Sequence, residues 1–191
     1  MISLNQDAVI PNILNLNHSI KAKVFWISFF TILTAIGAQI EVPNHPIPFT
    51  LQTFFVLLAG AFLGSTNGAI SLAVYLFAGM LGLPVFSHGG FGIAKLFGIT
   101  GGYLLSFPIA AFVVGSLIQK YNNFIWICVS MFVGMIIIFS FGTLYLNMVM
   151  VHNLKQAFFS GFLIFSWWDV LKIFSAAAIY YEFSKRITKQ N

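Results

Sequence analysis

Apolar residues fall into six long stretches along this chain, separated by polar segments or by breaks rich in glycine and proline. A transmembrane helix needs about 20 predominantly apolar residues, and most of the stretches approach or exceed that length. The pattern therefore predicts an all-α membrane protein, a six-transmembrane-helix bundle that forms one domain. The stretches cover residues 24–40, 49–63, 69–83, 97–118, 124–150 and 158–183.

The second and third stretches are short and lie between the densest groups of helix-breaking residues. At about 15 residues each they would form roughly 22 Å of helix, against a hydrocarbon core of about 30 Å. Pro43, Pro46 and Pro48 precede the second stretch, and Pro84 follows the third. Short, interrupted segments point to the binding site of a transport protein, because irregular backbone is tolerated at depth only where protein or a cavity covers it. Two tilted or extended helices joined by ordinary loops would also fit the pattern.

The composition excludes a soluble domain. Of the 191 residues, 59% are hydrophobic and 7% are charged, whereas soluble domains carry about 25% charged residues. We therefore expect a multi-pass protein of the cell membrane, surrounded by lipid. The net charge of +5 does not indicate nucleic-acid binding, because the basic residues lie mainly near the two ends of the chain.

These basic residues predict the orientation of the protein in the membrane. By the positive-inside rule the segments that carry them face the cytoplasm, which places both termini inside. Lys95 and Lys155 are exceptions, in loops expected outside. We expect a polar N-terminal cytoplasmic segment at 1–20, the transmembrane domain at 21–186 and a polar tail at 187–191. Residues 1–20 lack the apolar core of a signal peptide, so the first stretch is expected to remain as a span. The basic residues concerned are Lys21, Lys23, Lys120, Lys185, Arg186 and Lys189.

Asp169 and Lys172 are the leading candidates for function. They lie in the last apolar stretch of a chain that has only nine Lys or Arg and four Asp or Glu residues. At a spacing of i,i+3 they share one face of a helix and partly neutralise each other. A charge at the centre of a membrane helix costs roughly 2.5–3.5 kcal/mol, so such a pair marks a ligand contact or a proton relay. A structural ion pair is the alternative.

Small residues four positions apart lie on the first stretch, as Thr31 with Ala35 and Thr34 with Ala38. This spacing lets helix backbones approach closely. Packing within the bundle would explain it, and the same face could instead receive another membrane subunit.

The sequence carries no pattern typical of catalysis, cofactor binding or metal binding. Its four histidines are scattered without metal-ligand spacing, and the single cysteine, Cys128, lies in an apolar run. No Gly-x-x-x-x-Gly-Lys loop is present, so any energy from ATP would have to come from another protein. A small intramembrane enzyme with Asp169 as its acid or base is the alternative of a different class.

Three blocks of sequence carry more specific information: Pro46-Ile47-Pro48-Phe49-Thr50-Leu51-Gln52, Thr100-Gly101-Gly102-Tyr103 and Asp169-Val170-Leu171-Lys172. Together with residues 37–40, 56–60 and 82–92 they resemble the BioY family, over roughly residues 25–184. BioY proteins are the biotin-specific S components, the substrate-binding subunits, of energy-coupling factor (ECF) transporters.

The resemblance implies capture of biotin from outside by a six-helix protein with a pocket near its outer face. In the family an acid and a lysine that open the last helix contact biotin, and they correspond to Asp169 and Lys172. A carboxylate and an ammonium complement the N–H donors and the carbonyl of the ureido ring. The loop 41–49 would act as a lid, and Lys95 is the candidate for the biotin carboxylate. The expected substrate-binding residues are Gln52, Phe86, Gly90, Lys95, Thr100, Tyr103, Asp169 and Lys172.

The resemblance also implies partners, an ECF coupling subunit and two ATPase subunits, with Thr31, Thr34, Ala35 and Ala38 as the docking face. An S component for another small vitamin is the alternative within this class. Two positions depart from the family pattern: residues 164–168 lack its prolines, and Ile99 replaces the proline before Thr100. Losing a proline restores a backbone N–H donor, which leaves room for a different entry into the last helix.

Overall fold

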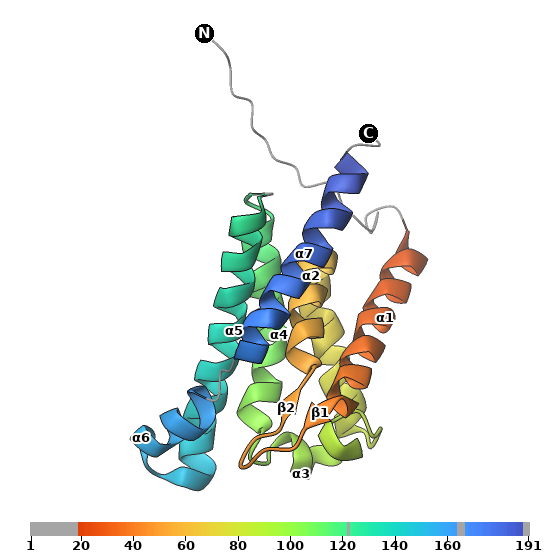
Figure 1. The fold of residues 1–191 in the computed structure, drawn as a ribbon. Helices are drawn as coiled ribbons and strands as arrows, with labels where there is room; N and C mark the ends of the chain where they lie inside the picture. Colours follow the sequence, from red (N-terminus) through yellow and green to blue (C-terminus); the bar gives the residue numbers. More distant parts are fainter. Residues whose placement is uncertain (1–18, 122, 164–166, 189–191) are drawn as a thin grey trace.

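The computed structural model describes residues 19–121, 123–163 and 167–188, and within them the protein is an all-α membrane protein with one short β-hairpin (Figure 1). Most of the predicted segment 1–20 and of the tail 187–191, and the departure from the family at 164–166, lie outside the described residues. The long elements are α1 (Ile20–Gln39), α2 (Gln52–Met80), α4 (Gly101–Ile118), α5 (Phe124–Leu146) and α7 (Trp167–Thr188). The short ones are β1 (Glu41–Val42), β2 (Phe49–Thr50), η1 (Ser87–Gly89), α3 (Gly92–Leu96), η2 (Asn147–Val151), α6 (Leu154–Ala157) and η3 (Phe158–Phe162).

Four helices of the described chain are long and apolar enough to cross a membrane: α1, α2, α4 and the helix that runs from α5 through η2. The count rises to five if the bent pair Leu154–Phe162 and Trp167–Arg186 is one span. These helices agree with the predicted all-α membrane protein. The count treats α2 as one helix, although the sequence predicted two separate stretches in this region.

Gly64 divides α2 into two parts. Its φ of 76° and ψ of −178° lie in a region open essentially to glycine alone. A Cβ on Gly68 would lie 3.0 Å from the carbonyl oxygen of Ala59, although nine residues of straight helix would hold these positions about 13 Å apart. The chain therefore folds back at Gly64, and residues 52–63 and 65–80 form a helical hairpin. The two short stretches expected at 49–63 and 69–83 correspond to its two arms.

Close backbone contacts join α2 to α4. A Cβ on Gly60 would overlap the carbonyl of Ala111, and one on Gly115 would overlap the backbone at Ser65. Small residues at such crossings let helices approach within van der Waals distance, which drives helix association where lipid removes the hydrophobic driving force. The α2–α4 pair is thus a tightly packed centre on which the other helices lie.

The small residues of α1 lie toward α2. Thr31 donates to the carbonyl of Ser71 at 2.9 Å, while Thr34 and Ala38 are fully buried and Ala35 is partly exposed. Packing within the bundle, one of the two expected roles, therefore accounts for Thr34 and Ala38, and docking of another subunit at this stripe stays a prediction. The exposed side of α1 carries mainly larger apolar residues, among them Val24, Phe25, Phe29, Ile32 and Ile36.

We expect Gly64→Ala to lower the free energy of unfolding by about 1–3 kcal/mol, because alanine does not tolerate this backbone conformation. Thermal unfolding in detergent measures the effect, with the exposed Thr66→Ala next to the break as the control. An unchanged melting temperature for Gly64→Ala would contradict the sharp reversal at this residue.

Candidate ligand-binding site

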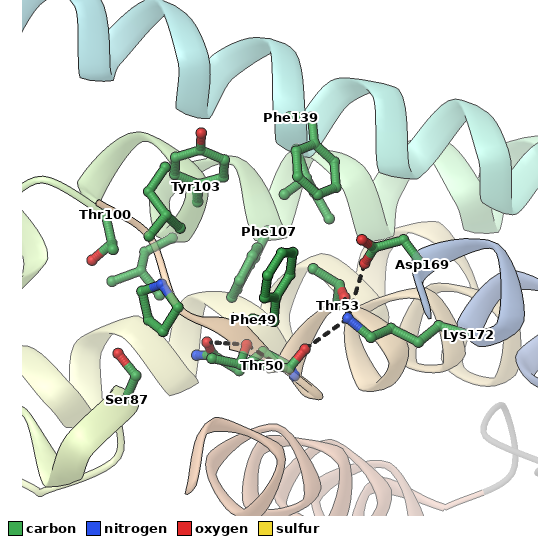
Figure 2. Close-up of a pocket in the computed structure, with 15 residues that line it drawn as sticks. Phe49, Thr50, Thr53, Ser87, Thr100, Tyr103, Phe107, Phe139, Asp169 and Lys172 are labelled. Carbon is green, nitrogen blue, oxygen red and sulfur yellow. Dashed lines mark hydrogen bonds and ion pairs between the residues drawn. The ribbon is translucent and has the colours of Figure 1, made fainter. Parts of the chain in front are cut away.

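A pocket lies where β2 and the start of α2 meet α4, α5 and α7 (Figure 2). The β1–β2 hairpin marks this end of the bundle in Figure 1. The cavity volume of the pocket is about 60 Å³, far below the range of about 300–1,000 Å³ for small-molecule sites, so side chains at its wall must move apart to enclose a small molecule. The walls are mainly apolar, with a few converging polar groups. The lining residues are Ile47, Pro48, Phe49, Thr50, Gln52, Thr53, Ser87, Thr100, Tyr103, Leu104, Phe107, Ile138, Phe139, Asp169 and Lys172.

Asp169 and Lys172 form an ion pair at one side of this pocket, with 2.9 Å between Nζ and Oδ1. Asp169 is 1% exposed and belongs to the first turn of α7, where the helix dipole stabilises a carboxylate. The Lys172 ammonium also donates to the carbonyl of Thr50 at 2.8 Å and to Oγ1 of Thr53 at 3.3 Å (Figure 2). Its contacts therefore connect α7 to β2 and α2.

A chain of buried hydrogen bonds continues from Thr50 beneath the pocket. The Thr50 hydroxyl donates to Oε1 of Gln52 at 2.8 Å, and Nε2 of Gln52 donates to the Tyr75 hydroxyl at 2.5 Å. Tyr75 in turn donates to the carbonyl of Val85 at 2.9 Å. The polar groups on this side of the pocket are thus held in one orientation by neighbours that are themselves bonded.

The segment between α1 and α2 is attached to the turn at 86–90 by polar contacts. Nε2 of Gln39 donates to the carbonyl of Phe86, and Oε1 accepts from the N–H of Gly89, each at 3.0 Å. Nδ1 of His88 pairs with the carboxylate of Glu41. Pro48 and Phe49 at the end of this segment line the pocket, so the segment forms part of its wall.

The structure brings five of the eight predicted substrate-binding residues to the pocket wall and leaves three outside it. Phe86 is fully buried behind the pocket, edge-on to Tyr75. Gly90 pairs with Phe86 through a backbone bridge, and a Cβ on it would overlap the side chain of Lys95. Lys95 lines a neighbouring hollow that shares Pro48 with the main pocket. The five at the wall are Gln52, Thr100, Tyr103, Asp169 and Lys172.

Sequence reasoning did not single out several pocket residues. Thr50 lies in the proline-rich block next to Gln52, so the block itself could have indicated it. Phe107 follows Tyr103 by one helical turn and could have been found from that spacing. Phe139 lies within the uniformly apolar α5, where no local signal distinguishes it.

Comparison with known proteins identifies the family. The model of the BioY family matches residues 12–189. The chain belongs to the BioY family. This confirms the resemblance inferred from the sequence blocks.

Relatives in this family are similar over most of their length. The chain is 43% identical to "Biotin transporter BioY" of Thermotoga maritima, over 78% of this chain and 88% of the relative. It is 39% identical to "Probable biotin transporter BioY" of Pyrococcus horikoshii, over 83% and 94%. A crystal structure of the S-component for biotin from an ECF-type ABC transporter superposes with a TM-score of 0.81 at 26% identity, covering 92% of this chain and 94% of that one.

In the ligand-free protein, Lys172→Met is expected to lower the free energy of unfolding by about 3–5 kcal/mol, because it removes the ammonium beside a buried carboxylate. Thermal unfolding provides the measurement, and the exposed Lys155→Met is the control. Asp169→Asn combined with Lys172→Met should recover most of the loss. Equal melting temperatures for Lys172→Met and Lys155→Met would show that the Asp169–Lys172 ion pair does not contribute to stability.

Proposed function

We propose that this protein is the biotin-binding S component of an ECF-type transporter and mediates biotin uptake across the membrane. The observation that carries the proposal is the Asp169–Lys172 pair at the wall of an apolar pocket, in a chain of the BioY family. The names of the relatives and the matching biotin S-component support it. Family members are transport proteins, and the role proposed here is binding rather than catalysis.

The proposed pose places the ureido ring of biotin against Asp169 and Lys172. The carboxylate accepts from a ring N–H, and the ammonium donates to the ring carbonyl, both as charge-assisted hydrogen bonds. Lys172 already donates to Thr50 and Thr53, so the ligand replaces the weaker of these contacts. The aromatic rings of Phe49, Phe107 and Phe139 would cover the apolar part of the bicycle.

The biotin carboxylate is proposed to reach the neighbouring hollow. That hollow shares Pro48 and Thr100 with the pocket and carries Lys95 and two histidines, His45 and His88. An ammonium here would neutralise the carboxylate, while Phe86 and Gly90 support the walls from behind. This arrangement gives Lys95 the role expected of it from the sequence.

For the topology, we propose six membrane passages with both termini in the cytoplasm. The helical hairpin at Gly64 supports the count, because its two arms run in opposite directions. The start of α1, the α4–α5 turn and the end of α7 lie at the same end of the bundle (Figure 1), and all three carry basic residues. The pocket at the opposite end would then face outward, within a transmembrane domain of residues 21–186.

The proposed partners are an ECF coupling subunit and two ATPase subunits, since the chain has no nucleotide-binding loop of its own. The coupling subunit would approach the exposed side of α1, beside Ala35, because Thr34 and Ala38 are enclosed by the bundle. Thr31, hydrogen-bonded to Ser71, would stabilise α1 in that orientation.

Purified protein should bind biotin with nanomolar affinity, which corresponds to about −12 kcal/mol. Asp169→Asn should weaken binding by about 2–5 kcal/mol, because an amide replaces the charged acceptor and leaves Lys172 without its counter-charge. Isothermal titration calorimetry measures both, and the exposed Glu182→Gln on the same helix is the control. Absence of saturation by the folded wild-type protein at micromolar biotin would refute the proposed function.

Lys95→Gln should weaken biotin binding by about 1.5–3 kcal/mol, the contribution of a hydrogen bond to a charged group. Biotin methyl ester lacks the negative charge, so its affinity should be lower in the wild type and almost unaffected by the substitution. Titration of both ligands into wild type, Lys95→Gln and Lys155→Gln separates a carboxylate contact from a general effect of charge. Equal losses for acid and ester would place the carboxylate elsewhere.

A further inference from the structure

Two reciprocal contacts between a tyrosine and a glycine join α4 to α5. The ring of Tyr103 on α4 lies against Gly142 on α5, where any Cβ would overlap it. The side chain of Tyr145 on α5 lies in the same way against Gly102 on α4. Gly142 thus makes room for the ring of Tyr103, and Gly102 for Cβ and Cγ of Tyr145.

Each tyrosine hydroxyl extends beyond its glycine to a backbone carbonyl of a different segment. Tyr103 donates to the carbonyl of Gly161 in η3 at 3.0 Å, and Tyr145 donates to the carbonyl of Phe97 after α3 at 2.8 Å. The two bonds bridge 58 and 48 positions of sequence. The pair of helices thus holds two segments that flank the pocket end of the bundle.

Only one of the two rings also contacts the ligand pocket. Tyr103 is 7% exposed and lines the pocket together with Phe139, whose ring lies 6.1 Å away at 84° (Figure 2). Its opposite side is closed by the backbone of Gly142, and a Cβ on Gly161 would come within 2.8 Å of its hydroxyl. A side chain at either glycine would have to displace the ring.

From this geometry we infer that Gly142 and Gly161 are positioning residues for ligand recognition. With Tyr103 they form a tyrosine clasp: Gly142 sets how far the ring projects into the pocket, and Gly161 accepts the bond that attaches η3 to the pocket wall. The choice of biotin as the probe rests on the proposed function. The clasp rests only on the contacts of Tyr103 with Gly142 and Gly161.

The first experiment measures biotin affinity by calorimetry in a double-mutant cycle. Gly142→Ala should weaken binding by roughly tenfold or more, and the same change in a Tyr103→Ala background should have little further effect, because the ring it displaces is gone. Gly134→Ala is the matched control, since its Cβ would overlap Val114 on the same helix pair without touching Tyr103. It should lower the melting temperature while leaving affinity near wild type. Additive losses in the cycle, or full affinity of Gly142→Ala, would overturn the inference.

The second experiment needs no ligand and covers the case in which Gly142→Ala does not fold. Amide hydrogen exchange of the ligand-free protein should become faster at 158–162 in Tyr103→Phe and faster around residue 97 in Tyr145→Phe, each variant sparing the other's segment. Gly161→Ala should speed exchange at 158–162 less in a Tyr103→Phe background than in the wild type. Phenylalanine lacks the hydroxyl that the new Cβ at position 161 would otherwise overlap. Failure of the wild type to bind biotin would reject the proposed function and leave this result intact. Unchanged exchange in both phenylalanine variants would overturn the clasp.

Discussion

The ammonium of Lys172 is the constraint on which the pocket end of this protein depends. A cation beside an apolar pocket is stable only while acceptors surround it. Here the acceptors come from three elements, the carboxylate of Asp169 on α7, the carbonyl of Thr50 in β2 and the hydroxyl of Thr53 on α2. Separating β2 and α2 from the last helix would therefore remove two of the three acceptors of the ammonium and leave only its partner within α7. The same group that would recognise a ureido carbonyl also holds the walls together.

Two parts of the bundle are built on different physics. Glycines at helix crossings, such as Gly60 and Gly115 between α2 and α4, bring backbones into direct contact and give a tightly packed centre. The segment that follows α1 is held instead by side-chain bonds from Gln39 and by the Glu41 pair with His88. A few polar contacts open more readily than a packed core. This division suits a protein that must admit a ligand, enclose it and later release it.

Local spacing explains which features could be predicted from the sequence. Asp169 and Lys172 are one helical turn apart, so their pairing follows from the helix alone. The two short stretches around residue 64 also predicted a break, because glycine and proline act on their own backbone. The identity of Tyr103 as a wall residue came from the resemblance to BioY proteins. By contrast, Phe86 was expected to contact the ligand, but in the structure it is fully buried against Tyr75 and does not line the pocket. No local sequence pattern predicts this contact.

Three conclusions followed from the order of residues alone: that this is a helical membrane protein, which family it belongs to and which charged residues form a pair. Composition, motif and i,i+3 spacing are properties of the chain before it folds. The contact of Lys172 with Thr50, 122 positions away, is visible only in the folded protein. The same is true of the packing of Thr31 on α1 against α2 and of the ring of Tyr103 against Gly142. These contacts join segments that the sequence keeps far apart, so their geometry is set by how helices pack and not by any one helix.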